Sequence, residues 1–224
     1  ARREGAQLVL TQQRFTYLPA PPSDEIKSGA LATGAASDAH WQVPVRVKLV
    51  TKSGSSVETL LLKEREARVN LPAGFEAAVV NEGGHGFYRV RYDTDLLDRI
   101  LRLVPDKMAP IERFNLVNDA WAATVAGLIP LSSYLDLTGR FKADRDKNVW
   151  GLIIDSFQAV NRIILARERA GLESLVRDRL QALVEELGWN PKPSDDELTK
   201  QLRGDVLRGI GTTAIFAGTD PSSS

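Results

Sequence analysis

The sequence contains no cysteine, two histidines and one methionine. The lack of cysteine excludes disulfides, thiolate catalysis and cysteine-ligated metals. His40 and His85 lie far apart and outside any HExxH pattern, so they do not provide the three protein ligands of a catalytic zinc. We therefore expect no catalytic residue, no cofactor-binding residue and no metal ligand in this chain. A cytoplasmic location is the expectation that fits a chain without cysteine.

Excess charge and long apolar runs are also missing. Lys+Arg and Asp+Glu are equal at 29 each, so the neutral chain has no electrostatic reason to bind nucleic acid or an anionic membrane. No run of about 18 apolar residues is present, which predicts no membrane span. Gly83-Gly84-His85-Gly86 lacks both the G-x-G-x-x-G pattern and a Walker lysine, so it predicts a hairpin turn and not a phosphate loop.

The first part of the chain has the two-residue alternation of β-strands. Val43, Val45, Val47 and Leu49 alternate with polar or small residues, and residues 57–63 return as a partner strand. Shorter strands are predicted near residues 8–13, 68–71, 77–80 and 86–92. Strands of this length and spacing predict an antiparallel β-sandwich over residues 1–93, with a long loop at 19–40.

The segment 86–92 is predicted to be the last strand of this sandwich. Tyr88, Val90 and Tyr92 would share one face of it. Arg89 and Arg91 would share the other face. The alternation therefore predicts a strand with one apolar face and one basic face.

After Asp93 the apolar period changes from two residues to 3.6. Asp93 or Thr94 is expected to cap a first helix, and Pro110 to open a second. Further helices are predicted near residues 131–141, 147–167 and 172–187, and a sixth after Ser194. Consecutive helices with short loops predict antiparallel helical hairpins, stacked like a solenoid, over residues 94–224. The expected fold class is thus α+β in two domains.

The second helix is expected to bury an apolar stripe. Its members at helical spacing are Ile111, Phe114, Val117, Trp121, Val125 and Leu128. No pattern indicates a carboxylate with a perturbed pKa. Adjacent acids such as Glu185 and Glu186 fit a solvated helix face.

Arginines are frequent in the helical part. Arg162, Arg177 and Arg208 are the candidates for holding the distal end of a peptide, because a guanidinium can bind a carboxylate with two hydrogen bonds. Solvated pairing with nearby Asp or Glu is the alternative for each of them. Glu173 and Arg177, for example, stand four residues apart, at the spacing of a helical ion pair.

Several ordered segments resemble the aminopeptidase N and puromycin-sensitive aminopeptidase family. The segment Gly86-Phe87-Tyr88-Arg89-Val90-Arg91-Tyr92-Asp93 resembles its G-[FY]-Y-R-V-x-Y-D pattern. Upstream, Gln13-Arg14-Phe15 and Trp41-Gln42-Val43-Pro44-Val45 resemble two of its strands. Downstream, residues 112–120 and Leu187-Gly188-Trp189 resemble its helical landmarks. The resemblance extends from about residue 8 to about residue 215.

The resemblance implies the C-terminal part of a zinc enzyme that removes N-terminal residues from peptides. In that family the sandwich follows the catalytic domain, and the helical domain covers the active site. The implied partners are the catalytic domain of the same protein and peptide substrates. The zinc ligands of the family have no counterpart here, so the zinc is expected in the parent protein. The lack of a polar capping helix after residue 216 predicts that the natural chain continues.

Three possibilities remain open. The chain is either such a region or a stand-alone scaffold made of a sandwich and a helical repeat, without peptidase activity. A third class, a small-molecule enzyme with a site between the two domains, predicts converging histidines or carboxylates there.

Overall fold

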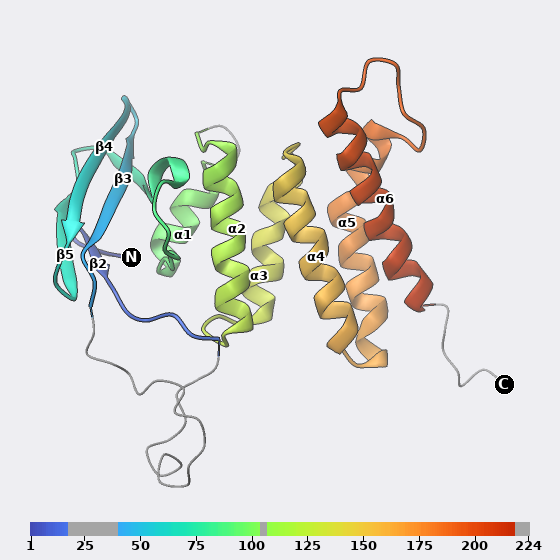
Figure 1. Cartoon of the computed structure of the whole chain (residues 1–224), viewed down its shortest axis with the longest axis horizontal. Coiled ribbons are helices and arrows are strands. Elements are labelled where there is room, and N and C mark those ends of the chain that lie inside the picture. Colours follow the sequence, from blue (N-terminus) through green and yellow to red (C-terminus); the bar gives the residue numbers. More distant parts are fainter. Residues whose placement is uncertain (18–39, 104–106, 218–224) are drawn as a thin grey trace, which may run out of the picture. The chain divides into compact units, whose positions relative to one another are not determined.

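The computed structural model describes residues 1–17, 40–103 and 107–217, with side chains up to Thr212. The loop expected at 19–40 therefore lies almost wholly outside the described residues. The chain forms two compact units, Ala1–Tyr134 and Leu135–Ser224. Six strands and six α-helices in the described part give an α+β class, as predicted (Figure 1).

The strands form two three-stranded antiparallel sheets in the first unit. One sheet has the order β1-β2-β5, with β1 at Arg2–Glu4, β2 at Gln7–Thr11 and β5 at Glu66–Asn70. The other has the order β4-β3-β6, with β3 at Val43–Thr51, β4 at Gly54–Leu62 and β6 at Phe75–Val80. The predicted pairing of β3 with β4 is confirmed, and it runs from Val43 opposite Leu62 to Thr51 opposite Gly54. Strand β1 is not predicted by the sequence, because its three polar residues have no apolar alternation.

Side chains from both sheets share one hydrophobic core. Leu8 and Leu10 of β2 lie in the same cluster as Val47 of β3, Ala78 of β6 and Leu96 of the first helix. All five are nearly inaccessible to solvent. The inward residues of β3 are those that the alternation selected, because successive side chains of a strand point to opposite faces.

The prediction that residues 86–92 form the last strand is wrong. After β6 the chain makes a short 3-10 turn at Glu82–Gly84, and residues 85–93 belong to neither sheet. The alternation of faces still holds, because Tyr88, Val90 and Tyr92 pack against the core. The segment does not pair with a strand of either sheet. Its hydrogen bonds are made to a side chain of α2, to the end of β6 and to the backbone of Ala1.

Two helices complete the first unit. Helix α1, Thr94–Leu101, begins at Asp93, whose carboxylate accepts a hydrogen bond from the backbone N–H of Leu96. Asp93 also accepts the N–H of Arg3, so the cap ties α1 to β1. Helix α2, Pro110–Val125, begins at the proline, as expected for a residue with no N–H to leave unpaired. Both predicted helix starts are confirmed.

Helix α3, Leu131–Thr138, is followed by three long helices of the second unit. These are α4 at Lys147–Ile163, α5 at Arg169–Leu187 and α6 at Glu197–Ala217. Helix α6 packs against both α4 and α5. Leu180 and Leu183 of α5 are fully buried with Trp150, Ile153 and Phe157 of α4, as the stripes predicted. The fourth helix ends at Ile163, earlier than expected, because Ile164 has an extended backbone.

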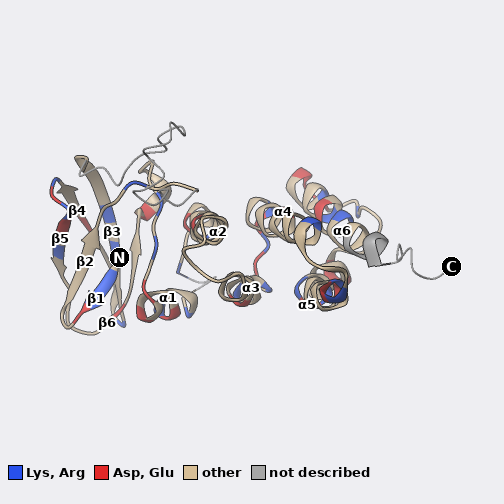
Figure 2. Ribbon diagram, turned by 90° about the horizontal axis from the view of Figure 1, so that it is seen from below, with Lys and Arg blue, Asp and Glu red and all other residues tan. Residues whose placement is uncertain are grey.

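Basic and acidic residues both occur along α5 and α6 (Figure 2). No helix in the described part is long and apolar enough to cross a membrane.

Candidate functional site at the buried face of helix α2

The buried face of α2 carries two carboxylates, Glu112 and Asp119. They stand seven residues apart, which is about two helical turns, so they share one face. Both are buried, at 3% and 9% exposure. The expected apolar stripe is therefore partly wrong, because Ile111, Val125 and Leu128 are 42–51% exposed. We call Glu112 and Asp119 the α2 carboxylates.

Glu112 joins three segments of the first unit. Its Oε2 accepts a hydrogen bond from Nζ of Lys48 on β3 at 2.5 Å and another from the backbone N–H of Ala109 at 2.9 Å. Its Oε1 accepts the N–H of Gly83, in the turn after β6, at 3.2 Å. Ala109 has no side chain able to cap α2, and Glu112 reaches back to the backbone there, as in half of a capping box. A single buried group thus connects the sheet, the turn and the start of α2.

Asp119 holds the segment that follows this turn. One oxygen accepts the N–H of Val90 at 2.8 Å, and the other accepts Nη1 of Arg89 at 3.3 Å. Arg89 also donates from Nη2 to the hydroxyl of Tyr17 at 3.2 Å, and its guanidinium lies 5.3 Å from the ring centre of Phe15. Asp119 therefore fixes the segment 89–90. Through Arg89 it also positions Phe15 and Tyr17, which follow β2 in the sequence.

Burial raises the pKa of Asp119 from 3.8 to about 6, although the hydrogen bonds from Val90 and Arg89 oppose this shift. The folded protein therefore holds a proton on Asp119 more tightly than the unfolded chain does. The stability that this proton contributes is fully present below pH 3.8 and is lost as pH rises through about 6.

Two further side chains, Asn81 and Tyr92, join this segment to the end of β6. Asn81 has a left-handed backbone, with φ of 66°, and its side-chain amide accepts the N–H of Gly86 at 2.7 Å and donates to the carbonyl of Gly86 at 3.0 Å. Tyr92 accepts the N–H of Val80 at 2.9 Å and donates to its carbonyl at 3.3 Å. Burial raises the pKa of the Tyr92 hydroxyl, so the hydroxyl keeps its proton at neutral pH. The missing strand ladder is thus replaced by side-chain hydrogen bonds from Asn81 and Asp119 and by backbone hydrogen bonds with Ala1.

A cavity of about 10 Å³ lies between the α2 carboxylates. Asn81, Tyr92, Glu112, Asn115 and Asp119 line it together with apolar side chains. This volume accommodates about one water molecule. The site is therefore too small for a substrate, and both carboxylates are occupied by donors of the chain itself. The site is therefore structural: Glu112 and Asp119 hold Lys48, Gly83, Arg89 and Val90 together, and we call this group the clamp.

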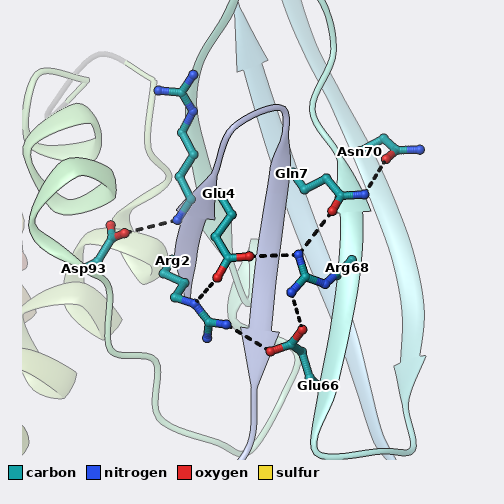
Figure 3. Close-up of polar contacts among 8 residues, drawn as sticks. Arg2, Glu4, Gln7, Glu66, Arg68, Asn70 and Asp93 are labelled. Atoms are coloured by element: carbon teal, nitrogen blue, oxygen red, sulfur yellow. Dashed lines mark hydrogen bonds and ion pairs between the residues drawn. The ribbon is translucent and has the colours of Figure 1, made fainter.

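A second polar cluster lies on the outer face of the first sheet (Figure 3). Arg2 binds Glu4 and Glu66, and Arg68 binds the same two carboxylates, at 2.7–2.9 Å. Hydrogen bonds from these guanidinium groups lower the pKa of Glu4 and Glu66. Because all four side chains are at least a third exposed, water screens the network, and we assign it a small share of the stability.

The three candidate arginines lie on three different helices of the second unit. Arg177 on α5 pairs with Glu173, as predicted, and Arg208 on α6 pairs with Asp205 at 2.8 Å. Arg162, at the end of α4, is exposed and has no ion-pair partner among residues 1–17, 40–103 and 107–217. No hydrogen bond or ion pair in the described part of the chain brings the three together.

The residues present do not fit the zinc of the family. Among the described residues, no group of three or more His, Cys, Asp or Glu is placed to hold a metal ion. His85 belongs to the turn after β6, and His40 precedes β3.

The part of the chain that contains the α2 carboxylates matches a known family. The sequence model of the ERAP1-like C-terminal domain matches residues 78–217, which is more than half of the chain. The chain belongs to this family. The matched range includes Asn81 and both α2 carboxylates, whereas Lys48 precedes it.

Curated relatives cover nearly the whole chain. The tricorn protease-interacting factor F2 of Thermoplasma volcanium is 26% identical over 94% of this chain and 23% of its own length. The puromycin-sensitive aminopeptidase of Caenorhabditis elegans is 26% identical over 90% and 21%. The glutamyl aminopeptidase of Sus scrofa is 29% identical over 89% and 21%. The predicted resemblance to a C-terminal part of these aminopeptidases is confirmed. The chain spans about a fifth of the length of the curated relatives it matches.

Proposed function

We propose that this chain is a non-catalytic C-terminal region of a zinc aminopeptidase that removes N-terminal residues from peptides. The observation that carries the proposal is the match to aminopeptidases over about a fifth of their length, within a C-terminal domain family. In this proposal the zinc and the catalytic residues belong to the part of the parent protein outside this chain. The partners are that catalytic part and the peptide substrates.

The strands and helices have distinct roles in the proposal. Residues 1–93 form a β-sandwich that spaces the helices from the catalytic part, and residues 94–224 form a solenoid-like helical domain that covers the active site. The two sheets with one core support the sandwich. The α2 carboxylates support a rigid connection, because they tie α2 to β3 and to the segment after β6.

The exposed arginines are proposed to receive the distal end of a peptide. Arg162 is the strongest of the three, because Arg177 and Arg208 already have carboxylate partners. Replacing Arg162 with Ala in the full-length enzyme should raise KM for long peptides and leave KM for aminoacyl amides unchanged. An R102A variant, at an exposed arginine outside the three candidates, is the matched control. Equal KM values for R162A and the parent on long peptides would contradict this role.

The main proposal is tested by comparing two proteins with aminoacyl fluorogenic substrates. We expect no turnover by this chain alone. We expect turnover by the protein from the complete reading frame, lost with a chelator and restored with zinc. Zinc-dependent turnover by the chain alone would contradict the proposal. A reading frame without an upstream HExxH would favour the stand-alone scaffold instead.

A further inference from the structure

The segment after the turn presents a regular outward face. From Phe87 to Tyr92 the exposure alternates residue by residue. Tyr88, Val90 and Tyr92 pack against the core, whereas Phe87, Arg89 and Arg91 are exposed. Phe87 is 109% exposed, so its ring contacts almost nothing in the described part of the chain. We call Phe87, Arg89 and Arg91 the outward row.

Two aromatic residues that follow β2 in the sequence extend this row. Phe15 and Tyr17 meet edge to face, with ring centres 5.1 Å apart. Both contact the guanidinium of Arg89, Phe15 through its ring and Tyr17 through its hydroxyl. Tyr17 remains 51% exposed. The outward row, Phe15 and Tyr17 therefore form one surface, which is held in place from below by Asp119.

The charge of this surface is positive. Asp119 neutralises Arg89, but Arg91 has no ion-pair partner among residues 1–17, 40–103 and 107–217. None of the five side chains of the surface is acidic. Aromatic residues and arginine are the types that dominate binding energy at protein interfaces. The surface thus fits an apolar pocket that is bordered by a carboxylate.

The size of the surface favours an occupant in the same polypeptide. A stable interface between separate proteins uses about 20–30 residues on each side, many more than this surface offers. A contact within one polypeptide needs less area, because the covalent connection raises the effective concentration. The relatives are four to five times longer than the matched part, so each contains a large further region in the same chain.

We propose that the outward row, with Phe15 and Tyr17, docks on the catalytic part of the same longer polypeptide. Phe87 fills an apolar pocket there, and Arg91 meets a carboxylate at the rim of that pocket. The proposal rests on the proposed function, since it requires a catalytic part in the same chain.

Cysteine labelling tests the docking directly, because this chain contains no cysteine. The F87C substitution is made in the 224-residue chain and in the full-length parent, and the labelled site is identified by peptide mass spectrometry. V125C is the matched control, on an exposed residue of α2 in the same unit. The F87C thiol should react about tenfold more slowly in the parent than in the chain alone, since a buried thiol is protected. The V125C thiol should react at the same rate in both.

A second pair of variants tests the charge. R91E should restore most of the labelling of F87C in the parent, whereas R102E, at an exposed arginine after α1, should not. Equal F87C labelling rates in the parent and in the chain alone would overturn the proposal. So would protection that depends on the concentration of the isolated chain, because this would indicate a second copy as the occupant. Zinc-dependent activity of the same parent preparation reports on the proposed function separately: an active parent with a freely labelled F87C thiol contradicts only the docking.

Discussion

Removal of the Glu112 side chain should lower the free energy of unfolding of the first unit. The E112A substitution leaves the N–H groups of Ala109 and Gly83 without their acceptor. Both hydrogen bonds are only partly buried, so each unpaired N–H costs less than the roughly 1–3 kcal/mol of a fully buried one. It also leaves Lys48, whose side chain is 15% exposed, without its carboxylate. Breaking a buried ion pair on one side costs about 3–5 kcal/mol, and we expect E112A to fall in this range.

The assay is hydrogen exchange in urea followed by mass spectrometry. It reports the free energy of unfolding separately for residues 1–134 and 135–224, which are the two compact units. E112A should lower the stability of the first unit only. The matched control is D95A, which removes the exposed partner of Arg99 and should cost at most about 1 kcal/mol.

A double-mutant cycle with K48M separates the ion pair from the backbone contacts. Because K48M/E112A leaves no unpaired charge, its cost should be smaller than the sum of the two single costs by about 1–3 kcal/mol. The double variant should still be less stable than the parent, since the two N–H groups stay unpaired. A cost of E112A below about 1 kcal/mol, or strictly additive single costs, would refute the clamp as derived from the contacts of Glu112.

Three further predictions concern single side chains. Relative to D119N, the parent should gain up to about 3 kcal/mol of stability as pH falls from 7 to 4, because burial raises the pKa of Asp119 from 3.8 to about 6; parallel pH profiles in urea titrations would contradict this. N81A should cost about 2 kcal/mol, and N81G less, because alanine loses both bonds to Gly86 and also strains the left-handed backbone; equal costs would remove the strain argument. R203K should destabilise the second unit by about 2 kcal/mol, because Arg203 is 3% exposed and its guanidinium bonds both Leu187 and Asp195; unfolding midpoints unchanged in that unit would contradict it.

The clamp shows where sequence reasoning reached its limit. Of the apolar stripe expected on α2, Val117 is buried, whereas Ile111, Val125 and Leu128 are exposed. The buried face instead follows the spacing of Glu112 and Asp119. This spacing was visible, but acidic residues are normally exposed, and a buried acid is stable only with partners. The partners Lys48 and Arg89 stand 64 and 30 residues away in the sequence.

Local patterns, by contrast, were sufficient for many elements. The alternation of Val45 and Val47 gave β3, and Asp93 and Pro110 marked the starts of α1 and α2. The buried residues Val176 and Leu180 of α5 followed from the helical period. The resemblance in the segments around Gly86 and Glu112 indicated the family that the comparison confirmed.

The sequence by itself determined what depends on near neighbours: the periods of strands and helices, the caps, and the absence of cysteine. The tertiary structure decided what depends on contacts distant in the sequence. Residues 86–92 have the alternation of a strand, yet they join neither sheet. Asn81 and Asp119 bind the backbone of Gly86 and Val90 instead, and the N-terminal amine of Ala1 donates to the carbonyl of Arg91. A period of two specifies which side chains point inward, but only the packing of the whole unit specifies which groups meet the backbone. For this reason Phe87 and Arg91 face outward, on the surface proposed to meet the rest of the parent protein.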